Sequence, residues 1–261
     1  MTGQAPHPLN DATDAARTGA PAGRIYSGLQ SSERALERHG RLVEAGLEVF
    51  GTTGYPGAKI KSLCQGAGLS ERYFYESFES REQLLMAVYD QVASDLMRHV
   101  MDALQEPGLE LRASVRAGMA AVVNFMLDDP RHARIILVEI VGVSPDFEAK
   151  RHKSMSEFAA ESMRQLLLLS GLDPQTVHQQ SADNPQDIAL ATALDFARLT
   201  AVSMVGGVNN MLLDAVLGGT TYNTERITDV AFQLIYNAST GIRALAAGES
   251  CVPAGEPTPP A

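Results

Sequence analysis

A short run of polar and aromatic side chains at residues 70–76 has the composition of a surface that contacts nucleic acid. Arginine can donate two hydrogen bonds to guanine, and hydroxyl groups and cations can bind phosphate oxygens. If a helix covers residues 71–78, Phe74 and Phe78 form an inward i, i+4 pair and leave one face free. That face carries Glu71, Arg72, Tyr73, Tyr75 and Glu76. A bare helical face of this width fits the major groove of DNA, with its N-terminal residues leading.

No motif for catalysis or metal binding accompanies this run. The sequence contains no GxSxG, HExxH, P-loop or GxGxxG pattern. Its six histidines are scattered, and Cys64 and Cys251 have no CxxC or zinc spacing. His132 and Glu139 could share a helix face, although a surface pair is the simpler interpretation. We therefore expect no catalytic residue, no metal site and no cofactor, and keep an all-helical enzyme as the rival class.

Three helices, a longer one followed by two short ones, must position the polar run at residues 70–76. Apolar residues at helical spacing predict a first helix over 32–50 and a second from Ile60 to Gly68. One or two residues separate the second helix from the third, which Ser70 can cap. The expected mini-core consists of Ile60, Leu63, Ala67, Leu69, Phe74 and Phe78, with Cys64 as a further small core residue. Two short helices joined by a tight glycine turn, after a stabilising helix, are typical of a helix-turn-helix.

The run from Val43 to Leu85 resembles the DNA-binding domain of the TetR (tetracycline-repressor-like) family. The matching elements are Ala45-Gly46, Phe50, Gly54-Tyr55, Ile60, Leu63-Cys64, Ala67-Gly68-Leu69-Ser70, Phe74-Tyr75, Phe78 and the Ser-Arg-Glu-x-Leu start of a fourth helix at Ser80. So many matches at the correct spacing make the resemblance specific. The helical remainder has the right length for the variable ligand-binding body of that family.

The resemblance implies a role for each side chain of the helix-turn-helix. Contacts to DNA phosphates fall to Lys59, Ser70, Tyr75 and Arg81. Base contacts fall to Glu71, Arg72 and Tyr73, with Arg72 the strongest candidate because arginine reads guanine with two hydrogen bonds. Lys59 stands where the family often has threonine, and Arg81 replaces the usual lysine.

The rest of the chain predicts helices and no strands, so the fold class is all-α. A fourth helix begins with a capping box at Ser80 and Gln83 and reaches about residue 104. Five more helices are expected over 109–127, 130–142, 145–170, 187–217 and 224–246, with a polar loop over 171–186. The implied domains are a disordered arm (1–30), a three-helix helix-turn-helix DNA-binding domain (31–79), a helical ligand-binding and dimerisation domain (80–247) and a disordered tail (248–261).

The last two long helices are the expected dimerisation surface. Segment 187–217 is apolar almost all round, and its small residues permit close approach of another helix: Ala193, Ala197, Ala201, Gly206 and Gly207. In the family that the sequence resembles, these helices pair with their mates in a four-helix bundle, which implies a homodimer. From the residues alone, a helix buried within one chain fits nearly as well.

Methionines and isolated polar groups among the middle helices predict a cavity for a small effector. The candidate lining residues are Met119, Asn124, Phe125, Met155, Met204 and Asn209. Because the body is acidic, a neutral or cationic apolar effector is favoured unless Arg131, Arg134 or Arg164 turns inward. The alternative is a core in which methionine only fills gaps.

The charge distribution sets limits on partners and location. The net charge is −10, but residues 31–78 hold six acidic and six basic side chains, so a DNA face there depends on local placement. The N-terminus lacks the apolar core of a signal peptide, and the most apolar stretch, Leu199–Leu213, is too short to cross a bilayer. We expect a bacterial cytoplasmic protein with no membrane partner, nucleoid-associated when bound to DNA, whose Arg17 and Arg24 could reach DNA from a flexible arm.

The expected function is that of a ligand-responsive transcription regulator, with a repressor favoured, that binds a pseudo-palindromic operator in double-stranded DNA as a dimer. Its small-molecule effector is unidentified and expected to be apolar. Two alternatives stay open: a DNA-bound architectural or scaffolding member of the family without a ligand, and the all-helical enzyme. Helix four, which connects head and body, is the expected lever between effector and DNA.

Overall fold

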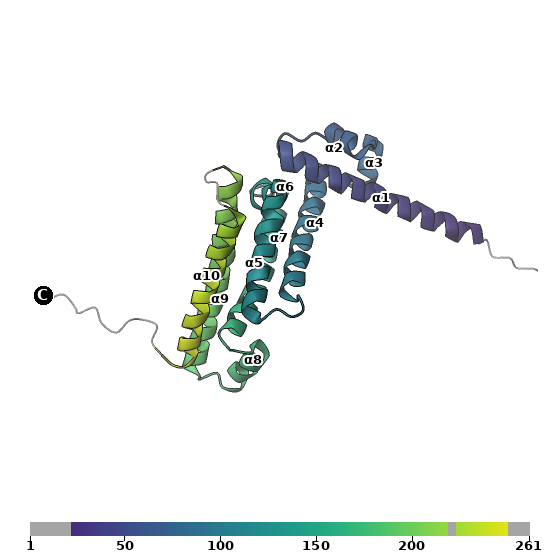
Figure 1. Cartoon of the computed structure of the whole chain (residues 1–261). Helices are drawn as coiled ribbons and strands as arrows, with labels where there is room; N and C mark the ends of the chain where they lie inside the picture. The colour runs from purple at the N-terminus through teal and green to yellow at the C-terminus, as the bar shows by residue number, and fades with distance from the viewer. Residues whose placement is uncertain (1–21, 219–222, 250–261) are drawn as a thin grey trace, which may run out of the picture. The chain divides into compact units, whose positions relative to one another are not determined.

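The computed structural model describes residues 22–218 and 223–249, with side chains from residue 32 onward. These residues form helices joined by short connections (Figure 1): α1 (Ala22–Thr53), α2 (Ile60–Ala67), α3 (Glu71–Ser77), α4 (Arg81–Leu104), α5 (Leu111–Asp128), α6 (Pro130–Arg134), the π-helical turn η1 (Ile135–Glu139), α7 (Pro145–Leu169), α8 (Pro174–Asp183), α9 (Ile188–Val216) and α10 (Thr224–Ala246). The predicted all-α class is confirmed for this part of the chain. The chain divides into two compact units, Met1–Glu37 and Arg38–Ala261. The helix-turn-helix contacts and the cavity lie within the second unit.

Helix α1 begins at Ala22 rather than at residue 32, so the predicted disordered arm is wrong over residues 22–30. No proline follows Pro21 within the helix, and a helix that is already nucleated gains one hydrogen bond for each residue added to it. The remainder of the predicted arm, including Arg17, lies outside the described residues. The predicted tail also lies outside them from residue 250 onward.

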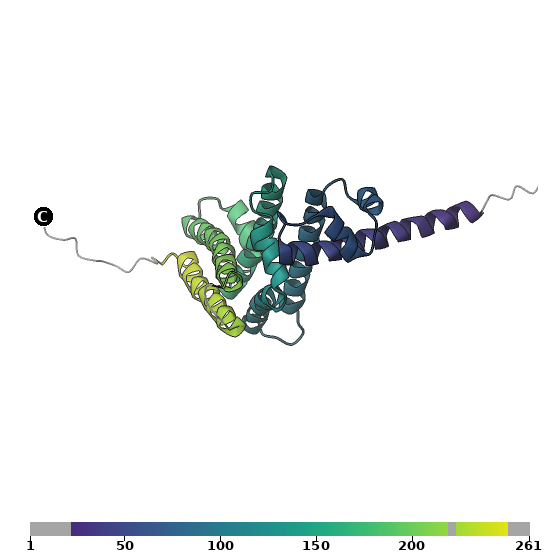
Figure 2. The same ribbon diagram turned by 90° about the horizontal axis from the view of Figure 1, so that it is seen from above.

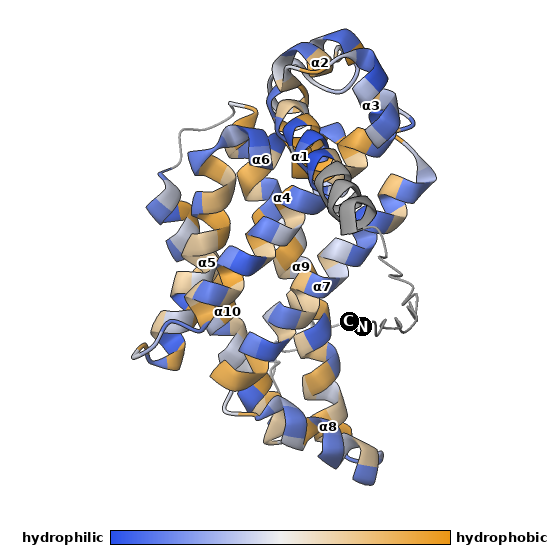
Figure 3. Cartoon of the chain, turned by 90° about the vertical axis from the view of Figure 1, so that its right-hand side faces the viewer, coloured by the Kyte–Doolittle hydropathy of each residue, from blue (hydrophilic) through white to orange (hydrophobic). Residues whose placement is uncertain are grey.

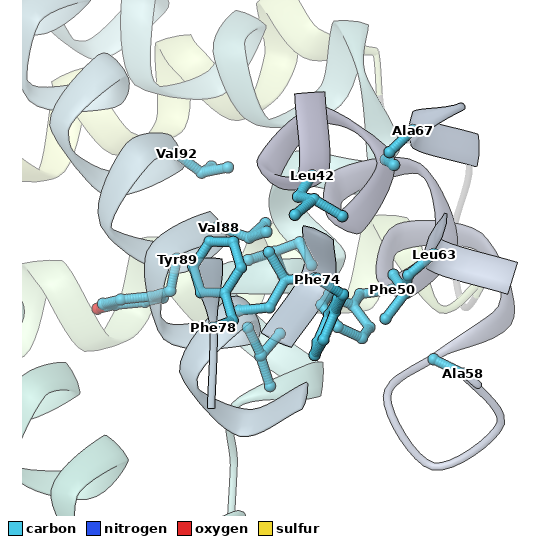
Figure 4. Close-up of a cluster of buried hydrophobic side chains, with 14 of the residues drawn as sticks. Leu42, Phe50, Ala58, Leu63, Ala67, Phe74, Phe78, Val88, Tyr89 and Val92 are labelled. Carbon is cyan, nitrogen blue, oxygen red and sulfur yellow. The ribbon is translucent and has the colours of Figure 1, made fainter. Parts of the chain in front are cut away.

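A continuous apolar cluster joins the helix-turn-helix to the start of the body (Figure 4). Phe50 of α1 and Phe74 of α3 have no exposed surface, and Tyr89 of α4 is almost fully buried beside them. Two residues from later in the chain, Ile135 and Phe147, belong to the same cluster. The boundary expected at residues 79/80 therefore crosses a shared core.

The body is a bundle of long amphipathic helices. Helix α4 packs along α5, and α9 packs against both α7 and α10. Seen from above, α9 and α10 lie side by side at one edge of this unit (Figure 2). Hydrophobic and hydrophilic residues alternate around the helices, as expected where one face of each helix is buried (Figure 3).

Two predictions for the connections are wrong. The polar loop expected over 171–186 contains helix α8, which Asp173 caps by accepting a hydrogen bond from the Thr176 N–H at 2.9 Å. Because Val177 is the buried apolar residue of α8, the helix carries no apolar stripe for a pattern to reveal. The helix expected over 130–142 is a single α-helical turn followed by η1, and the chain turns away at Gly142, which has a φ of 73°.

Helix α9 is longer than the apolar stretch identified from the sequence. The helix has 29 residues, and an 18-residue window within it has a mean hydropathy of 1.5, so by length and composition it could cross a membrane. Core helices of soluble proteins meet the same criterion, and Ala193, Ala197 and Ala201 of α9 are buried inside the bundle. Length and hydropathy of this helix therefore do not distinguish a core helix from a membrane span.

Candidate nucleic-acid interface and internal cavity

The turn between α2 and α3 depends on a left-handed glycine. Gly68 has φ 61° and ψ 37°, and its N–H donates to the Gln65 carbonyl while the Leu69 N–H donates to the Cys64 carbonyl at 2.9 Å. A Cβ at Gly68 would come within 2.7 Å of the Arg41 guanidinium. That guanidinium donates to the carbonyls of Ala67 and Gly68, so a side chain of α1 holds the turn in place. The turn thus fixes the angle between α2 and α3.

The expected mini-core holds α3 in place. Leu63, Ala67, Phe74 and Phe78 are buried, and Ile60 and Leu69 pack against them partly exposed. Cys64 is buried as expected of a core residue; burial, and then the nearby Glu71 carboxylate, raise the pKa of its thiol. Since the apolar side of α3 is occupied, its other side faces solvent.

The solvent-facing side of α3 presents the residues predicted to read bases. The side chains of Glu71, Arg72 and Tyr73 are exposed, and the Arg72 side chain retains 84% of its accessible surface. Its Nε donates to the Glu76 carboxylate at 3.0 Å. This hydrogen bond with Glu76 orients the Arg72 side chain along α3. The exposed Arg72–Glu76 pair is the main feature of the candidate interface.

Arg38 of α1 also lies at this face, although the sequence did not predict it there. Its guanidinium lies 4.8 Å from the centre of the Tyr73 ring and 3.9 Å from the Glu76 carboxylate. A cation over an aromatic ring restrains both side chains. Nothing in the spacing of the sequence reveals this contact, because it depends on how α1 crosses α3.

The residues expected to bind phosphate fall into two groups. Lys59, Ser70 and Tyr75 are exposed, with Lys59 at the N-cap position of α2 and Ser70 at that of α3. Ser70 occupies the predicted position, but its hydroxyl accepts no capping hydrogen bond. Helix N-termini carry free N–H groups that favour anions, so the positions of Lys59 and Ser70 are compatible with the predicted phosphate contacts, which stay a prediction.

Arg81 has a different environment from the one expected. Its guanidinium donates to the carbonyls of Tyr55, at 3.3 Å, and of Ala58, and it lies 5.1 Å from the centre of the Tyr55 ring. The side chain therefore fastens the α1–α2 loop to the start of α4. These hydrogen bonds give Arg81 a structural role, and the phosphate contact expected from the resemblance stays a prediction.

An internal cavity of about 290 Å³ lies among α4, α5, η1, α7 and α9. Met119, Met155, Met204 and Asn209, four of the six residues predicted to bind an effector, line it. The other two do not. Asn124 is exposed on α5, and Phe125 stacks on His132 with ring centres 4.3 Å apart.

The charge inside the cavity differs from the expectation. Arg131, Arg134 and Arg164 all pair with carboxylates elsewhere. Instead Arg151 lines the cavity, and its guanidinium binds Glu148 at 2.8 Å. It is the charged residue of the lining, whose polar part is completed by Tyr89, Ser154, Ser162, Asn209 and Asn210. Because the Glu148 carboxylate pairs with this charge, the preference for a neutral or cationic apolar effector stays a prediction.

An exposed apolar face runs along α9 and α10. Phe196, Leu199 and Val202 of α9 and Leu234 of α10 each expose two-fifths or more of their surface. The alanines predicted to allow close approach of a second chain are instead buried within the bundle, whereas Gly207 lines an open apolar groove on this face. The apolar surface is thus present and includes the expected Gly207, but not the expected alanines.

The comparisons with known proteins agree with this geometry. Residues 42–88 match the sequence profile of "Bacterial regulatory proteins, tetR family". The HTH-type transcriptional activator FasR of Mycolicibacterium smegmatis is 30% identical over 114 residues, which cover 44% of this chain and 52% of FasR. The HTH-type transcriptional regulator UidR of Escherichia coli K12 is 23% identical over 133 residues, covering 48% and 63%. The matches thus span about half to two thirds of these relatives.

Solved structures with the same fold cover more of the chain. A transcriptional regulator from Rhodococcus sp. RHA1 has a TM-score of 0.60 at 17% identity, covering 78% of this chain and 96% of that one. The fatty acid degradation regulator FadR from Bacillus halodurans has a TM-score of 0.59 at 12% identity, covering 76% and 94%. The helix-turn-helix of this chain thus matches that of the tetR family of bacterial regulatory proteins over residues 42–88, and most of the chain shares its fold with the solved structures above.

Proposed function

We propose that the protein is a ligand-responsive transcription regulator that binds a pseudo-palindromic DNA operator as a homodimer and acts as a repressor. The observation that carries the proposal is the α3 face: Phe74 and the Gly68 turn fix the helix, while Arg72 remains exposed beside Glu71 and Tyr73. A rigid, solvent-facing helix of this kind can enter a major groove without rearrangement of the head.

Affinity for DNA is expected to come from phosphate contacts at the N-termini of α2 and α3. Lys59 and the α2 and α3 N-termini supply positive potential although the chain as a whole is acidic. Arg72, Glu71 and Tyr73 supply the base contacts. Arg81 is left out of the proposed interface because its hydrogen bonds hold the α1–α2 loop.

Dimerisation through α9 and α10 completes the proposed regulator. One recognition helix reads few base pairs, and a two-fold dimer reads two half-sites about one helical turn apart. The apolar side chains of α9 and α10 are exposed to water in a single chain, so pairing of two chains through this surface would be favourable. The regulator would work in the cytoplasm and lie on the nucleoid when bound to DNA.

The proposed effector site is the cavity among α4, α5, η1, α7 and α9. Its wall is mainly apolar, with methionines that adapt to shape and a few polar groups that would orient a ligand. Occupation would alter DNA affinity only by the difference in ligand affinity between the two states, and about 1–3 kcal/mol would give about 5–150-fold.

The test is to sequence genomic DNA fragments that the purified full chain enriches, and to measure binding to the best fragment by fluorescence anisotropy. We expect an inverted repeat in the enriched fragments, affinity that falls with salt, and loss of enrichment in Arg72→Ala. Enrichment without any shared motif, or equal enrichment by Arg72→Ala, would contradict the proposal. A thermal-shift screen on the same protein then identifies molecules that occupy the cavity, and their titration with and without operator measures the coupling.

A further inference from the structure

Glu139 is a buried carboxylate that connects segments far apart in the chain. Its side chain exposes 6% of its surface. Oε2 accepts a hydrogen bond from the backbone N–H of Tyr55 at 2.6 Å, and Oε1 accepts one from the Nε of Arg134 at 2.7 Å. A buried carboxylate without such partners would be strongly unfavourable, so these contacts hold the loop and the carboxylate together.

Arg134 and Gly54 complete the contact. The Nη1 of Arg134 donates to the Thr52 carbonyl at 2.8 Å, at the C-terminal end of α1. Gly54 has a φ of 87°, and a Cβ there would lie 3.0 Å from Arg134 Nη2 and 3.3 Å from both Glu139 carboxylate oxygens. Close approach of the loop backbone to this ion pair therefore requires glycine. We call Thr52, Gly54, Tyr55, Arg134 and Glu139 the latch.

The latch and the cavity share one turn of helix. Glu139 is the last residue of η1, and Ile136 and Leu137 of the same turn line the cavity. Ile135 of that turn is fully buried in the cluster that includes the helix-turn-helix. π-Helical turns are uncommon and occur frequently at functional sites, because their longer hydrogen-bonding step is strained relative to an α-helix. The cavity wall and the carboxylate that holds the loop are therefore parts of the same helical turn.

The other end of the loop is fixed to α4. Arg81 donates to the carbonyls of Tyr55 and Ala58, and Lys59 follows immediately as the N-cap of α2. The loop thus lies between two attachments to the rest of the fold and ends at a residue proposed to bind phosphate.

We propose that the latch is the contact through which occupation of the cavity reaches the DNA-binding head: η1 shifts, Glu139 and Arg134 reposition the α1–α2 loop, and α2 moves with it. This inference rests on the proposed function for its DNA readout, while its structural part is measurable without DNA. Glu139 is here a positioning residue, because it acts on the head through the loop and does not itself line the cavity.

The first experiment measures hydrogen exchange of the loop in the full chain. Glu139→Gln keeps the size of the side chain but removes the charge that both donors share. We expect the Tyr55 amide, followed in a peptide covering residues 51–59, to exchange at least about tenfold faster, since hydrogen bonds to charged groups are the stronger class. The matched control is Glu161→Gln, a carboxylate of α7 that pairs with Arg164 and lies away from the loop. An unchanged Tyr55 amide in Glu139→Gln would overturn the latch.

The second experiment is a double-mutant cycle between cavity and latch. Ser162→Phe on α7 places a ring into the cavity and serves as a built-in occupant, so no ligand is needed. We expect Ser162→Phe to change loop exchange several-fold in the presence of Glu139 and to have no further effect in Glu139→Gln. Additive effects of the two substitutions would mean that Glu139 only stabilises the fold, and would overturn the coupling. Arg134→Gln provides a second route to the same comparison if Glu139→Gln does not fold.

Binding of the enriched DNA fragment is then measured for the parent, Ser162→Phe, Glu139→Gln and the double variant. These measurements distinguish failure of the latch from failure of the proposed function. If the loop exchange is coupled and DNA affinity follows it, both stand. If the loop exchange is coupled but none of the proteins binds DNA specifically, the proposed function fails while the latch stands. Coupled exchange with DNA affinity indifferent to Ser162→Phe would overturn the inference that the latch signals to the head.

Discussion

At the scale of single residues, some contacts of the α3 side chains could be predicted from the sequence, and others became known only from the structure. The polar face could be predicted because helical spacing decides which side chains are free once Phe74 is buried. The pairing of Arg72 with Glu76 follows from the same i, i+4 spacing. The position of Arg38 over Tyr73 and the hydrogen bonds from the Arg81 guanidinium to the α1–α2 loop could not be predicted, since each depends on contacts between distant segments.

Arg72→Ala should lower affinity for the operator by about 1–3 kcal/mol and relax preference at one base in each half-site. The reason is the loss of a two-hydrogen-bond contact to guanine, while phosphate contacts remain. Binding to a panel of single-base operator variants, measured by anisotropy, gives both numbers. Arg98→Ala is the matched control, since Arg98 is an exposed arginine of α4 paired with Asp95. Equal losses in both variants would reject the base-reading role of Arg72.

Asp129 offers a test of stability against pH. Its carboxylate binds the Arg131 guanidinium at 2.6 Å and caps α6, and these hydrogen bonds hold its pKa below the usual range. A lowered pKa means that the ionised form stabilises the fold above the unfolded-state pKa of about 3.9 and that this contribution disappears as the pH falls through the folded-state value.

Asp129→Asn should therefore cost about 1 kcal/mol at neutral pH, as expected for a partly exposed ion pair. The difference from the parent chain should shrink below about pH 4. Urea unfolding at several pH values measures the difference. Asp173→Asn is the comparison, because Asp173 caps α8 without an arginine partner. A difference that stays constant down to pH 3 would contradict the ion-pair explanation.

At the scale of elements, helices with an apolar stripe were predictable and those without one were not. The three helices of the head and the long helices of the body follow their hydrophobic periodicity. Helix α8 has a start signal in Asp173-Pro174 but little apolar surface, and η1 differs from an α-helix by a hydrogen-bonding step that no residue type specifies. Four of the six predicted cavity residues line the cavity, whereas Asn124 is exposed because it lies on the outer face of α5.

Gly68→Ala should destabilise the head and weaken DNA binding. An L-residue in the left-handed region costs about 1 kcal/mol, and the new Cβ would also displace the Arg41 guanidinium. Gly40→Ala is the matched substitution, since Gly40 lies inside α1 and its Cβ would meet no atom within 4 Å. That change should stabilise the protein by about 0.5–1 kcal/mol. Thermal unfolding of both variants measures these effects, and a Gly68→Ala protein as stable as its parent would show that the turn tolerates a side chain.

At the scale of the whole molecule, the face of α9 and α10 should determine the assembly. Leu199→Glu combined with Val202→Glu places charge on side chains that are exposed in one chain, so the fold should survive while pairing fails. Light scattering at micromolar concentration should give twice the 27.9 kDa of one chain for the parent and a single chain for the variant.

Leu109→Glu tests whether any exposed leucine would have the same effect, because Leu109 lies in the connection between α4 and α5. That variant should keep the mass of the parent. A parent protein that scatters as a single chain, or a double-glutamate variant that remains paired, would place the dimer surface elsewhere.

The apolar cluster shared by Phe50, Phe74, Ile135 and Phe147 also limits how the protein can be re-engineered. A chimeric biosensor made by cutting at residues 79/80 would separate the two sides of this cluster and leave apolar surface on both fragments. Grafting the head onto another body would succeed only with a partner that replaces Ile135, Ile140 and Phe147, or with the segment from α4 to the first turn of α7 transferred as part of the module. The exchangeable unit of this protein is therefore larger than its helix-turn-helix.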